Sequence, residues 1–300
     1  MYRLCEDNSK QKPLIQCEYA HAMGNSEGGF KEYWDLVRKY PKYQGGFIWD
    51  FVDQSCRWTG KNGRTIYAYG GDFNRFDASD INFCDNGLIS PDRVPNPHAY
   101  EVRYFYQDIW TTLADAQKGI VKVYNEYFFR DLSAYRMEWE LLHDGRIVRT
   151  GSVESLSIAP HQTKDVTLDY GTIGTEGEWL LNVKYVLKNA EGMLPAGHTV
   201  AYDQLTLKAY EAPALEFANV KESNQDIIVP EIDATNSNYL VVKGENFDIE
   251  FNKYTGYLTV YEVEGVSYLE PGTALAPNFW RAPTDNDFGA GLQQKYVAWK

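Results

Sequence analysis

The sequence has no run of 18 apolar residues, no excess of basic charge and few cysteines. No transmembrane helix is therefore predicted, and the polar stretch Met1 to Lys12 lacks the apolar core of a signal peptide. The net charge of −13 argues against nucleic acid or an anionic membrane as a partner. The cysteines form no CxxC pair and are predicted to be free thiols, not zinc ligands or disulfides; they are Cys5, Cys17, Cys56 and Cys84.

Aromatic residues are abundant instead. They make up 15% of the 300 residues, within an apolar fraction of 44%. Flat rings cover sugar faces in carbohydrate sites, but ordinary strand packing also draws on aromatic residues and is the more common cause. A chain of this length predicts two or three domains with real cores.

The first 110 residues predict an α/β arrangement. Pro13 to Tyr19 and Gly45 to Val52 are short apolar runs typical of buried strands, and Ser26 to Tyr40 between them has helical spacing. A strand–helix–strand unit of this size favours a parallel sheet. The Gly- and Asp-rich stretch Tyr69 to Asn96 is too long for a plain connection and is predicted to be a functional loop, closed by the amphipathic segment Ala99–Tyr106.

Beyond residue 110 the hydrophobic pattern changes to alternation. Short alternating segments between residues 119 and 208, with turn sequences between them, predict an antiparallel β-sandwich of the immunoglobulin type. Residues 209–235, which include Pro213 and Pro230, are predicted to be a linker. Residues 238–270 predict a further β-meander.

Glu18 stands at the carboxyl end of the first predicted strand. In parallel α/β folds that end faces the active site, and a carboxylate is costly to bury there unless it is used or paired. A helix cap or a structural ion pair also explains a lone glutamate. His21 and Asn25 add hydrogen-bonding groups and Gly24 allows a tight turn, so the pattern favours a site.

The second predicted strand ends in the same way, with Trp49 and Asp50 at its carboxyl end. A tryptophan at the mouth of a barrel is a natural floor for a sugar ring. A tryptophan considered by itself is more often part of a core.

Five sequence strings carry a resemblance to the large bacterial β-galactosidases of glycoside hydrolase family 2. They are CEYAHAMGNS (17–26), QGGFIWDFVDQ (44–54), YGGDF (69–73), FCDNGL (83–88) and RAPTDND (281–287). Their order and spacing are similar to those of that family, and sister β-glucuronidases and β-mannosidases differ around the nucleophile. The resemblance covers essentially all 300 residues, densely before residue 100 and sharply again near residue 281.

The resemblance implies roles for particular side chains. Glu18 is the implied nucleophile, at the end of barrel strand seven, and forms a covalent galactosyl-enzyme. His21 is implied to bond galactose hydroxyls and to stabilise the transition state. Trp49, at the end of strand eight, is the implied platform beneath galactose, and the peptide bond after it is implied to be cis. Tyr19 and Asn86 are implied to bind substrate as well.

The resemblance also implies metal ions. The backbone oxygen of Phe83 and the side-chain oxygen of Asn86 are the implied ligands of an active-site Na⁺. Asp80 matches an acidic loop position, and Ser79 replaces the family's asparagine, which puts a peripheral magnesium site in doubt. The Mg²⁺ ligands and the acid/base carboxyl lie upstream in the family, and no segment of this chain matches them.

The implied fold class is multidomain, α/β followed by all-β. Residues 1–110 match the C-terminal portion of a TIM (β/α)₈ barrel, and residues 111–208 match an immunoglobulin-like β-sandwich. Residues 209–235 are the linker, and residues 236–300 match the N-terminal portion of the C-terminal β-supersandwich.

The implied activity is the retaining hydrolysis of terminal non-reducing β-D-galactose residues. Two carboxyl groups roughly 5–5.5 Å apart then act as nucleophile and as acid/base. Because only the nucleophile is matched, the isolated chain is expected to be inactive. The alternative is a non-catalytic carbohydrate-binding β-sandwich module with a degenerate barrel remnant. A β-galactoside substrate and a homo-oligomeric full-length protein are expected, and the compartment stays open between bacterial cytoplasm and periplasm.

Overall fold

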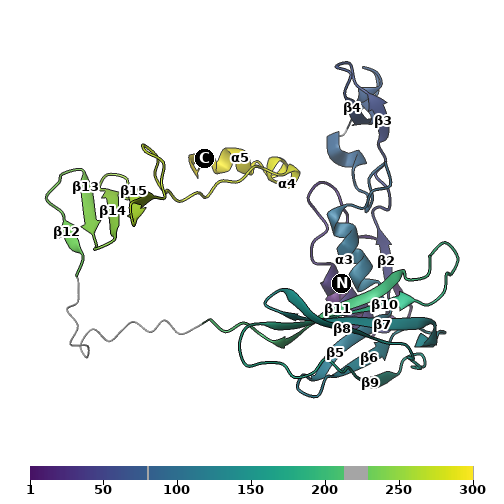
Figure 1. Ribbon diagram of the computed structural model, residues 1–300. Helices are drawn as coiled ribbons and strands as arrows, with labels where there is room; N and C mark the ends of the chain where they lie inside the picture. The colour runs from purple at the N-terminus through teal and green to yellow at the C-terminus, as the bar shows by residue number, and fades with distance from the viewer. Residues whose placement is uncertain (80, 213–228, 300) are drawn as a thin grey trace. The chain divides into compact units, whose positions relative to one another are not determined.

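The computed structural model describes residues 1–79, 81–212 and 229–299. The chain forms two units, Met1–Ala212 and Pro213–Lys300 (Figure 1). Asp80 and most of the predicted linker, residues 213–228, lie outside the described residues. Among the described residues, no helix is long and apolar enough to cross a membrane.

The first unit begins with a small α/β layer. After a short helix, α1 (Tyr2–Glu6), strands β1 (Leu14–Tyr19) and β2 (Tyr43–Ile48) pair in parallel and are connected by α2 (Phe30–Lys39). This confirms the predicted strand–helix–strand unit. The helix begins after the predicted start at Ser26, because Gly29 before it is in the left-handed region.

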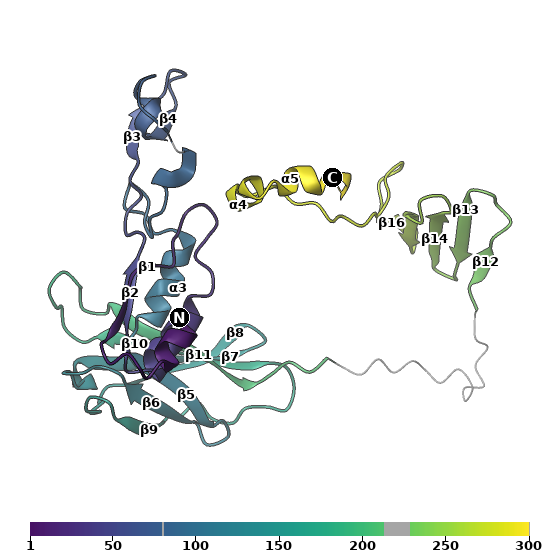
Figure 2. The ribbon, with the colours of Figure 1, turned by 180° about the vertical axis from the view of Figure 1, so that it is seen from behind.

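A compact apolar cluster holds this layer together. Tyr19, Phe30 and Val102 are buried against one another, with rings such as Tyr33 and Trp34 packed around them. Val102 belongs to α3 (Pro97–Phe105), which runs beside the two strands in both views (Figures 1 and 2). One face of the β1–β2 pair is therefore covered by helices.

The segment between β2 and α3 contains the predicted loop. A hairpin of β3 (Cys56–Thr59) and β4 (Thr65–Ala68), which the sequence pattern did not predict, comes first. The described residues of 69–96 then contain only the 3₁₀ turns η1 (Gly70–Asp72) and η2 (Ile81–Cys84) and single bridges at Ile89. The predicted long loop is thus confirmed.

Two antiparallel sheets form the rest of the first unit. Their strand orders are β11-β10-β7-β8 and β5-β6-β9. The strands are β5 (Ile109–Asp115), β6 (Ile120–Asn125), β7 (Tyr135–His143), β8 (Arg146–Val153), β9 (Thr163–Thr167), β10 (Trp179–Leu187) and β11 (Thr199–Lys208). The inward residues of both sheets, such as Val121 from β6 and Met137 from β7, share one core. The two sheets therefore form a sandwich.

Specific polar contacts join the α/β layer to the sandwich. Arg38 of α2 bonds both carboxylate oxygens of Glu126, and its guanidinium lies 4.4 Å from the ring centroid of Trp110. Buried Asp203 of β11 accepts from the Tyr104 hydroxyl at 2.9 Å and from the Thr111 amide at 2.7 Å. The Asp203 carboxyl is buried and bonded, and the Arg38–Glu126 contact is two-pronged, so specific hydrogen bonds fix the layer against the sandwich.

The second unit is a five-stranded meander followed by two short helices. Its sheet has the order β12-β13-β14-β15-β16. The elements are β12 (Glu231–Asp233), β13 (Tyr239–Lys243), β14 (Phe247–Asn252), β15 (Leu258–Val263), β16 (Val266–Ser267), α4 (Asp285–Gly289) and α5 (Leu292–Lys295). Residues 231–233, predicted as linker, are therefore a strand. None of the apolar side chains described in this unit is fully buried.

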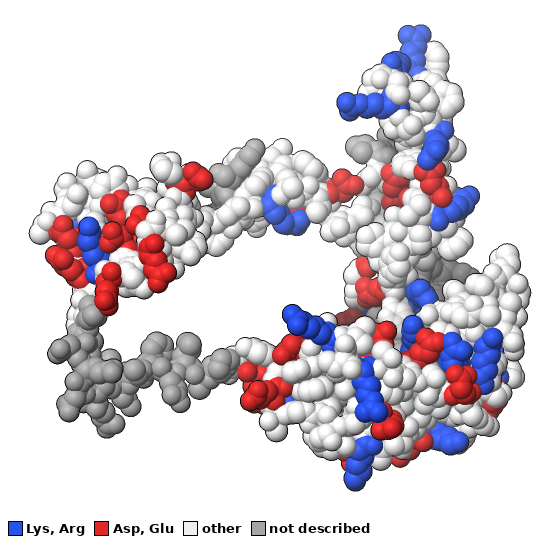
Figure 3. Space-filling view, viewed as in Figure 1, with Lys and Arg blue, Asp and Glu red and all other residues white. Residues whose placement is uncertain are grey.

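Acidic side chains gather on one face of this sheet (Figure 3). A shallow groove there is lined by Glu231, Asp233, Asp248 and Glu250, with Lys243 between them. The negative net charge of the chain is thus locally concentrated on the second unit, which does not favour a polyanionic ligand at this face.

Candidate active site

The carboxyl ends of β1 and β2 lie side by side, because the strands are parallel and Tyr19 pairs with Ile48. Glu18 and Tyr19 are consecutive, so the pleat sends their side chains to opposite faces. The Glu18 side chain is 45% exposed, whereas Tyr19 is buried. The strands approach closely at Gly46, where an added Cβ would lie 2.9 Å from the Cβ of Gln16.

His21 connects Glu18 to Asn86. Its Nδ1 lies 2.8 Å from Oε1 of Glu18, and its Nε2 lies 3.2 Å from Oδ1 of Asn86. A carboxylate can only accept, so Nδ1 donates to Glu18. Asn86 is fully buried, and its Nδ2 donates to the carbonyl oxygen of Phe83. The structure thus brings together four of the predicted site residues.

Two aromatic rings flank His21. The ring centroids of Trp49 and Phe83 both lie 6.4 Å from that of His21, and both side chains are partly exposed. The Trp49–Asp50 peptide bond is cis, which confirms the prediction. An exposed indole beside an exposed carboxylate is an arrangement that suits a sugar ring.

Backbone hydrogen bonds tie the three chain segments of the site together. The amide of Ala22 donates to the carbonyl of Trp49 at 2.9 Å, and the amide of Asp50 donates to the carbonyl of Asn86 at 2.7 Å. His21, Trp49 and Asn86 are therefore each at or next to a backbone group that is bonded to a neighbouring segment.

Gly87 is the anchor of the Asn86 segment. An added Cβ there would lie 2.1 Å from the backbone nitrogen of Asp53, so only glycine fits. Its amide donates to Asp53 Oδ1 at 2.6 Å, while its carbonyl accepts from Asn96 at 2.8 Å and lies 2.9 Å from Nε2 of His98. Burial raises the pKa of the Asp53 carboxyl, and the bond from Gly87 opposes that rise.

Tyr19 is the predicted site residue that the structure does not bring to Glu18. Its ring packs at 5.8 Å from Phe30, and its hydroxyl lies 3.0 Å from that of Tyr106. Burial, together with the bond to Tyr19, raises the pKa of Tyr106. The two phenols thus belong to the helix-covered face.

Three residues that support the site were not predicted from the sequence. Asp53 and His98 hold Gly87, and Glu27 is buried close to His98. A glutamate in a Gly-rich polar turn carries no sequence signal of burial, because α3 covers it only in the folded chain. Two aspartates, Asp50 and Asp53, follow Trp49, and this repetition was the one sequence signal for Asp53.

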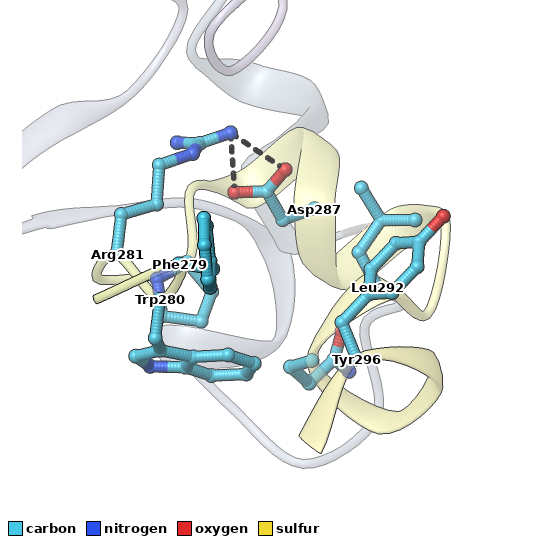
Figure 4. A pocket seen from close by; sticks show the side chains of 8 residues that line it. Phe279, Trp280, Arg281, Asp287, Leu292 and Tyr296 are labelled. Carbon is cyan, nitrogen blue, oxygen red and sulfur yellow. Dashed lines mark hydrogen bonds and ion pairs between the residues drawn. The ribbon is translucent and has the colours of Figure 1, made fainter. Parts of the chain in front are cut away.

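The second unit holds a separate pocket of about 380 Å³. Figure 4 shows the rings of Phe279, Trp280 and Tyr296 around it, with Arg281 reaching to Asp287. Both carboxylate oxygens of Asp287 are already bonded, to Arg281 and to the amide of Thr284. This carboxylate therefore serves local structure.

Family models match three parts of the chain. One described as "Glycosyl hydrolases family 2, TIM barrel domain" matches residues 2–111. "Beta-galactosidase, domain 4" matches residues 121–208, and "Beta galactosidase small chain" matches residues 243–300. The three matches follow the α/β layer, the sandwich and the second unit.

Curated relatives match along nearly the whole chain. The chain is 38% identical over 293 residues to a β-galactosidase of Priestia megaterium, covering 97% of this chain and 27% of the relative. It is 37% identical over 290 residues to one of Photobacterium profundum, covering 94% of this chain and 27% of that relative. The chain thus spans about a quarter of the length of these relatives. It belongs to glycoside hydrolase family 2, as a segment of the β-galactosidase kind.

Proposed function

We propose that this chain carries the nucleophile half of a retaining β-galactosidase active site. The observation that carries the proposal is the contact chain Glu18–His21–Asn86 at the carboxyl ends of two parallel strands. In a retaining mechanism a carboxylate attacks the anomeric carbon and a second carboxyl, roughly 5–5.5 Å away, protonates the leaving oxygen and then activates water. Glu18 suits the first role because it is exposed and oriented.

The neighbouring side chains have distinct proposed roles. The Nδ1–H of His21 holds one oxygen of Glu18, so the carboxylate is oriented before the sugar arrives. The indole of Trp49 would lie beneath the apolar face of galactose. Asn86 would fix His21 from behind and contact a sugar hydroxyl. Tyr19 stays a proposed substrate-binding residue that would have to act from the covered face.

The proposal includes a Na⁺ ion at Phe83 and Asn86. Carbonyl and amide oxygens are ligands that hard cations take, and these two groups are already in contact. Asn86 turns its nitrogen toward Phe83, so half a turn of the amide is needed before both oxygens face one point. The residues fit a cation after that turn, and the bound ion would supply a positive charge for a galactose hydroxyl. Mg²⁺ is proposed for the full-length protein only, on ligands outside this chain.

The finer domain assignment is part of the same proposal. Residues 1–110 would be the last two strands of a TIM barrel, and 111–208 an immunoglobulin-like sandwich. After the linker 209–235, residues 236–300 would open the C-terminal β-supersandwich. Exposed apolar side chains on β1 and β2, such as Ile15 and Phe47, support a barrel whose other strands come from elsewhere.

The alternative is a non-catalytic carbohydrate-binding module with a degenerate barrel remnant. A remnant under no catalytic demand has no reason to keep Glu18, His21 and Asn86 in one contact chain, so the geometry favours the enzyme. A β-galactoside substrate and homo-oligomeric assembly are proposed for the full-length protein.

The test uses a chimaera of this chain with the Priestia megaterium β-galactosidase. In it, the chain replaces the 293-residue segment that it matches, and the relative supplies the remaining polypeptide. We expect the chimaera to hydrolyse a chromogenic β-galactoside and the 300-residue chain alone to be inactive. If the chain alone hydrolyses the substrate and Glu18→Gln abolishes this turnover, the proposal that the chain lacks the acid/base would be refuted. A chimaera that stays fully active with Glu18→Gln would refute the nucleophile.

A further inference from the structure

Glu27 is a buried carboxyl that the proposed mechanism does not use. Its side chain is 1% exposed, and neither of its oxygens has a hydrogen-bond partner among the described residues. Its backbone has a φ of 66°, which non-glycine residues rarely adopt. It stands in the turn that also carries His21. An ionised carboxylate in such a place lacks any donor that would offset its loss of hydration.

His98 is the closest candidate donor, and its hydrogen is already in use. Its Nε2 lies 3.6 Å from Oε2 of Glu27 but 2.9 Å from the carbonyl oxygen of Gly87. A carbonyl can only accept, so Nε2 carries a hydrogen and gives it to Gly87. One N–H cannot serve both acceptors well. In the structure the Nε2–H of His98 is therefore bonded to Gly87, and Glu27 accepts no hydrogen bond from it.

The other groups that face Glu27 also disfavour its charge. Glu101 of α3 is a second carboxylate nearby, with Oε1 accepting from the amide of Phe30. Tyr106, just after α3, is a phenol that Glu27 also influences. Burial and then the repulsion from Glu101 raise the pKa of Glu27 to about 7. Glu27 can thus change charge in the neutral range of pH.

We propose that Glu27 is a positioning residue of the active site, which decides through His98 whether the Gly87 carbonyl keeps a second hydrogen bond beside the one from Asn96. When Glu27 is protonated, the Nε2–H of His98 stays on Gly87. When Glu27 is ionised, its charge attracts that hydrogen in a buried place where charge interactions are strong, and the carbonyl keeps only the bond from Asn96. Gly87 follows Asn86, so the loss of one of its bonds loosens the residue that fixes His21. The effect on the active site rests on the proposed function, whereas the pH-dependent change in the His98 hydrogen bond does not.

The experiment observes the Gly87 carbonyl directly. The dipeptide Gly-Leu occurs at two places, Gly87–Leu88 and Gly291–Leu292. The full chain, labelled with carbonyl-¹³C glycine and ¹⁵N leucine, therefore gives two cross-peaks in a spectrum that correlates each amide with the preceding carbonyl. The second peak comes from the other unit and is an internal control. The spectrum is recorded from pH 5.5 to 8.5.

We expect the Gly87 carbonyl shift to change with a midpoint near pH 7, while the Gly291 shift stays constant. Glu27→Gln should abolish the step and keep the low-pH shift, because glutamine resembles the protonated acid. Glu101→Gln is the matched control: it removes the neighbouring carboxylate and should move the midpoint to lower pH.

Two results would overturn the proposal. One is a Gly87 shift that does not respond to pH in the native chain. The other is a step that persists in Glu27→Gln, which would belong to a group other than Glu27. If Glu27→Gln does not fold, the direction of the midpoint shift in Glu101→Gln still decides, since an upward or absent shift contradicts the proposal. No turnover is measured, so the outcome is independent of whether Glu18 is the nucleophile.

Discussion

Nδ1 of His21 lies 2.8 Å from Oε1 of Glu18, three residues earlier in the chain. The turn between them allows a residue beyond the strand to fold back onto the carboxylate at its end. Because Asn86 holds the opposite side of the imidazole at 3.2 Å, the ring cannot swing away without losing a buried partner. The orientation of Glu18 therefore depends on a loop almost 70 residues further along the chain.

Loss of the imidazole is expected to reduce catalysis without loss of the fold. In the chimaera, His21→Phe should lower kcat/KM for a β-galactoside by about 10²–10⁴, because an oriented imidazole partner is lost. Steady-state kinetics measure the effect. His198→Phe, on the sandwich, is the control and should leave the rate unchanged. Equal effects of the two substitutions would contradict a specific role for His21.

Gly87→Ala is expected to destabilise the α/β layer. The added Cβ would lie 2.1 Å from the backbone nitrogen of Asp53. Strain of this kind costs about 1–3 kcal/mol or more. Urea unfolding, monitored by hydrogen exchange of residues 13–105, measures the loss of stability. Gly28→Ala is the matched control, since an added Cβ there meets nothing within 4 Å. A loss as large in Gly28→Ala would show that the close approach at Gly87 is not the cause.

Arg38→Lys is expected to weaken the junction between the α/β layer and the sandwich. Lysine keeps the charge but loses the two-pronged bond to Glu126 and the contact with the Trp110 ring, and we expect a cost of about 1–2 kcal/mol. The change in urea midpoint measures it. Arg130→Lys, in a more exposed pair with Glu191, should cost less than about 1 kcal/mol. The reverse order would argue against a fixed junction.

The buried Glu27 should make stability depend on pH. Its pKa is raised from 4.5 to about 7 in the folded chain, so the folded state binds the proton more tightly. The stabilisation is complete below pH 4.5 and is lost as pH rises to about 7, with at most about 3.5 kcal/mol involved at about 1.4 kcal/mol per pKa unit. Urea midpoints across this range measure the slope. Glu27→Gln should remove this slope, and an unchanged slope would assign it to other groups.

Local patterns predicted the elements whose signals lie within a few residues. The strand ending in Glu18 and the helix after it follow from apolar spacing, although Gly29 delays the helix start. The hairpin at Cys56–Thr59 was missed, because its strand residues are exposed and alternate weakly. Strand Ile109–Asp115, which forms a hairpin with the next strand, was also missed, because the core that covers its buried side is supplied by the tertiary fold.

The site was predicted only in part, for a similar reason. Glu18, His21, Trp49 and Asn86 belong to recognisable strings, and three of them meet in one contact chain. The support behind them, from Asp53, His98 and Glu27, arises where α3 closes over the turn. These contacts join residues from 34 positions apart (Asp53 and Gly87) to 71 positions apart (Glu27 and His98), which no local pattern records.

Covalent trapping tests the central claim most directly. The chimaera is treated with a 2-deoxy-2-fluoro-galactoside bearing a good leaving group, which lets the glycosyl-enzyme form but slows its hydrolysis. The labelled peptide is then identified by mass spectrometry. We expect label on Glu18, and no label when Glu18→Gln is treated in the same way. Label on any other carboxylate, with Glu18 unmodified, would contradict it.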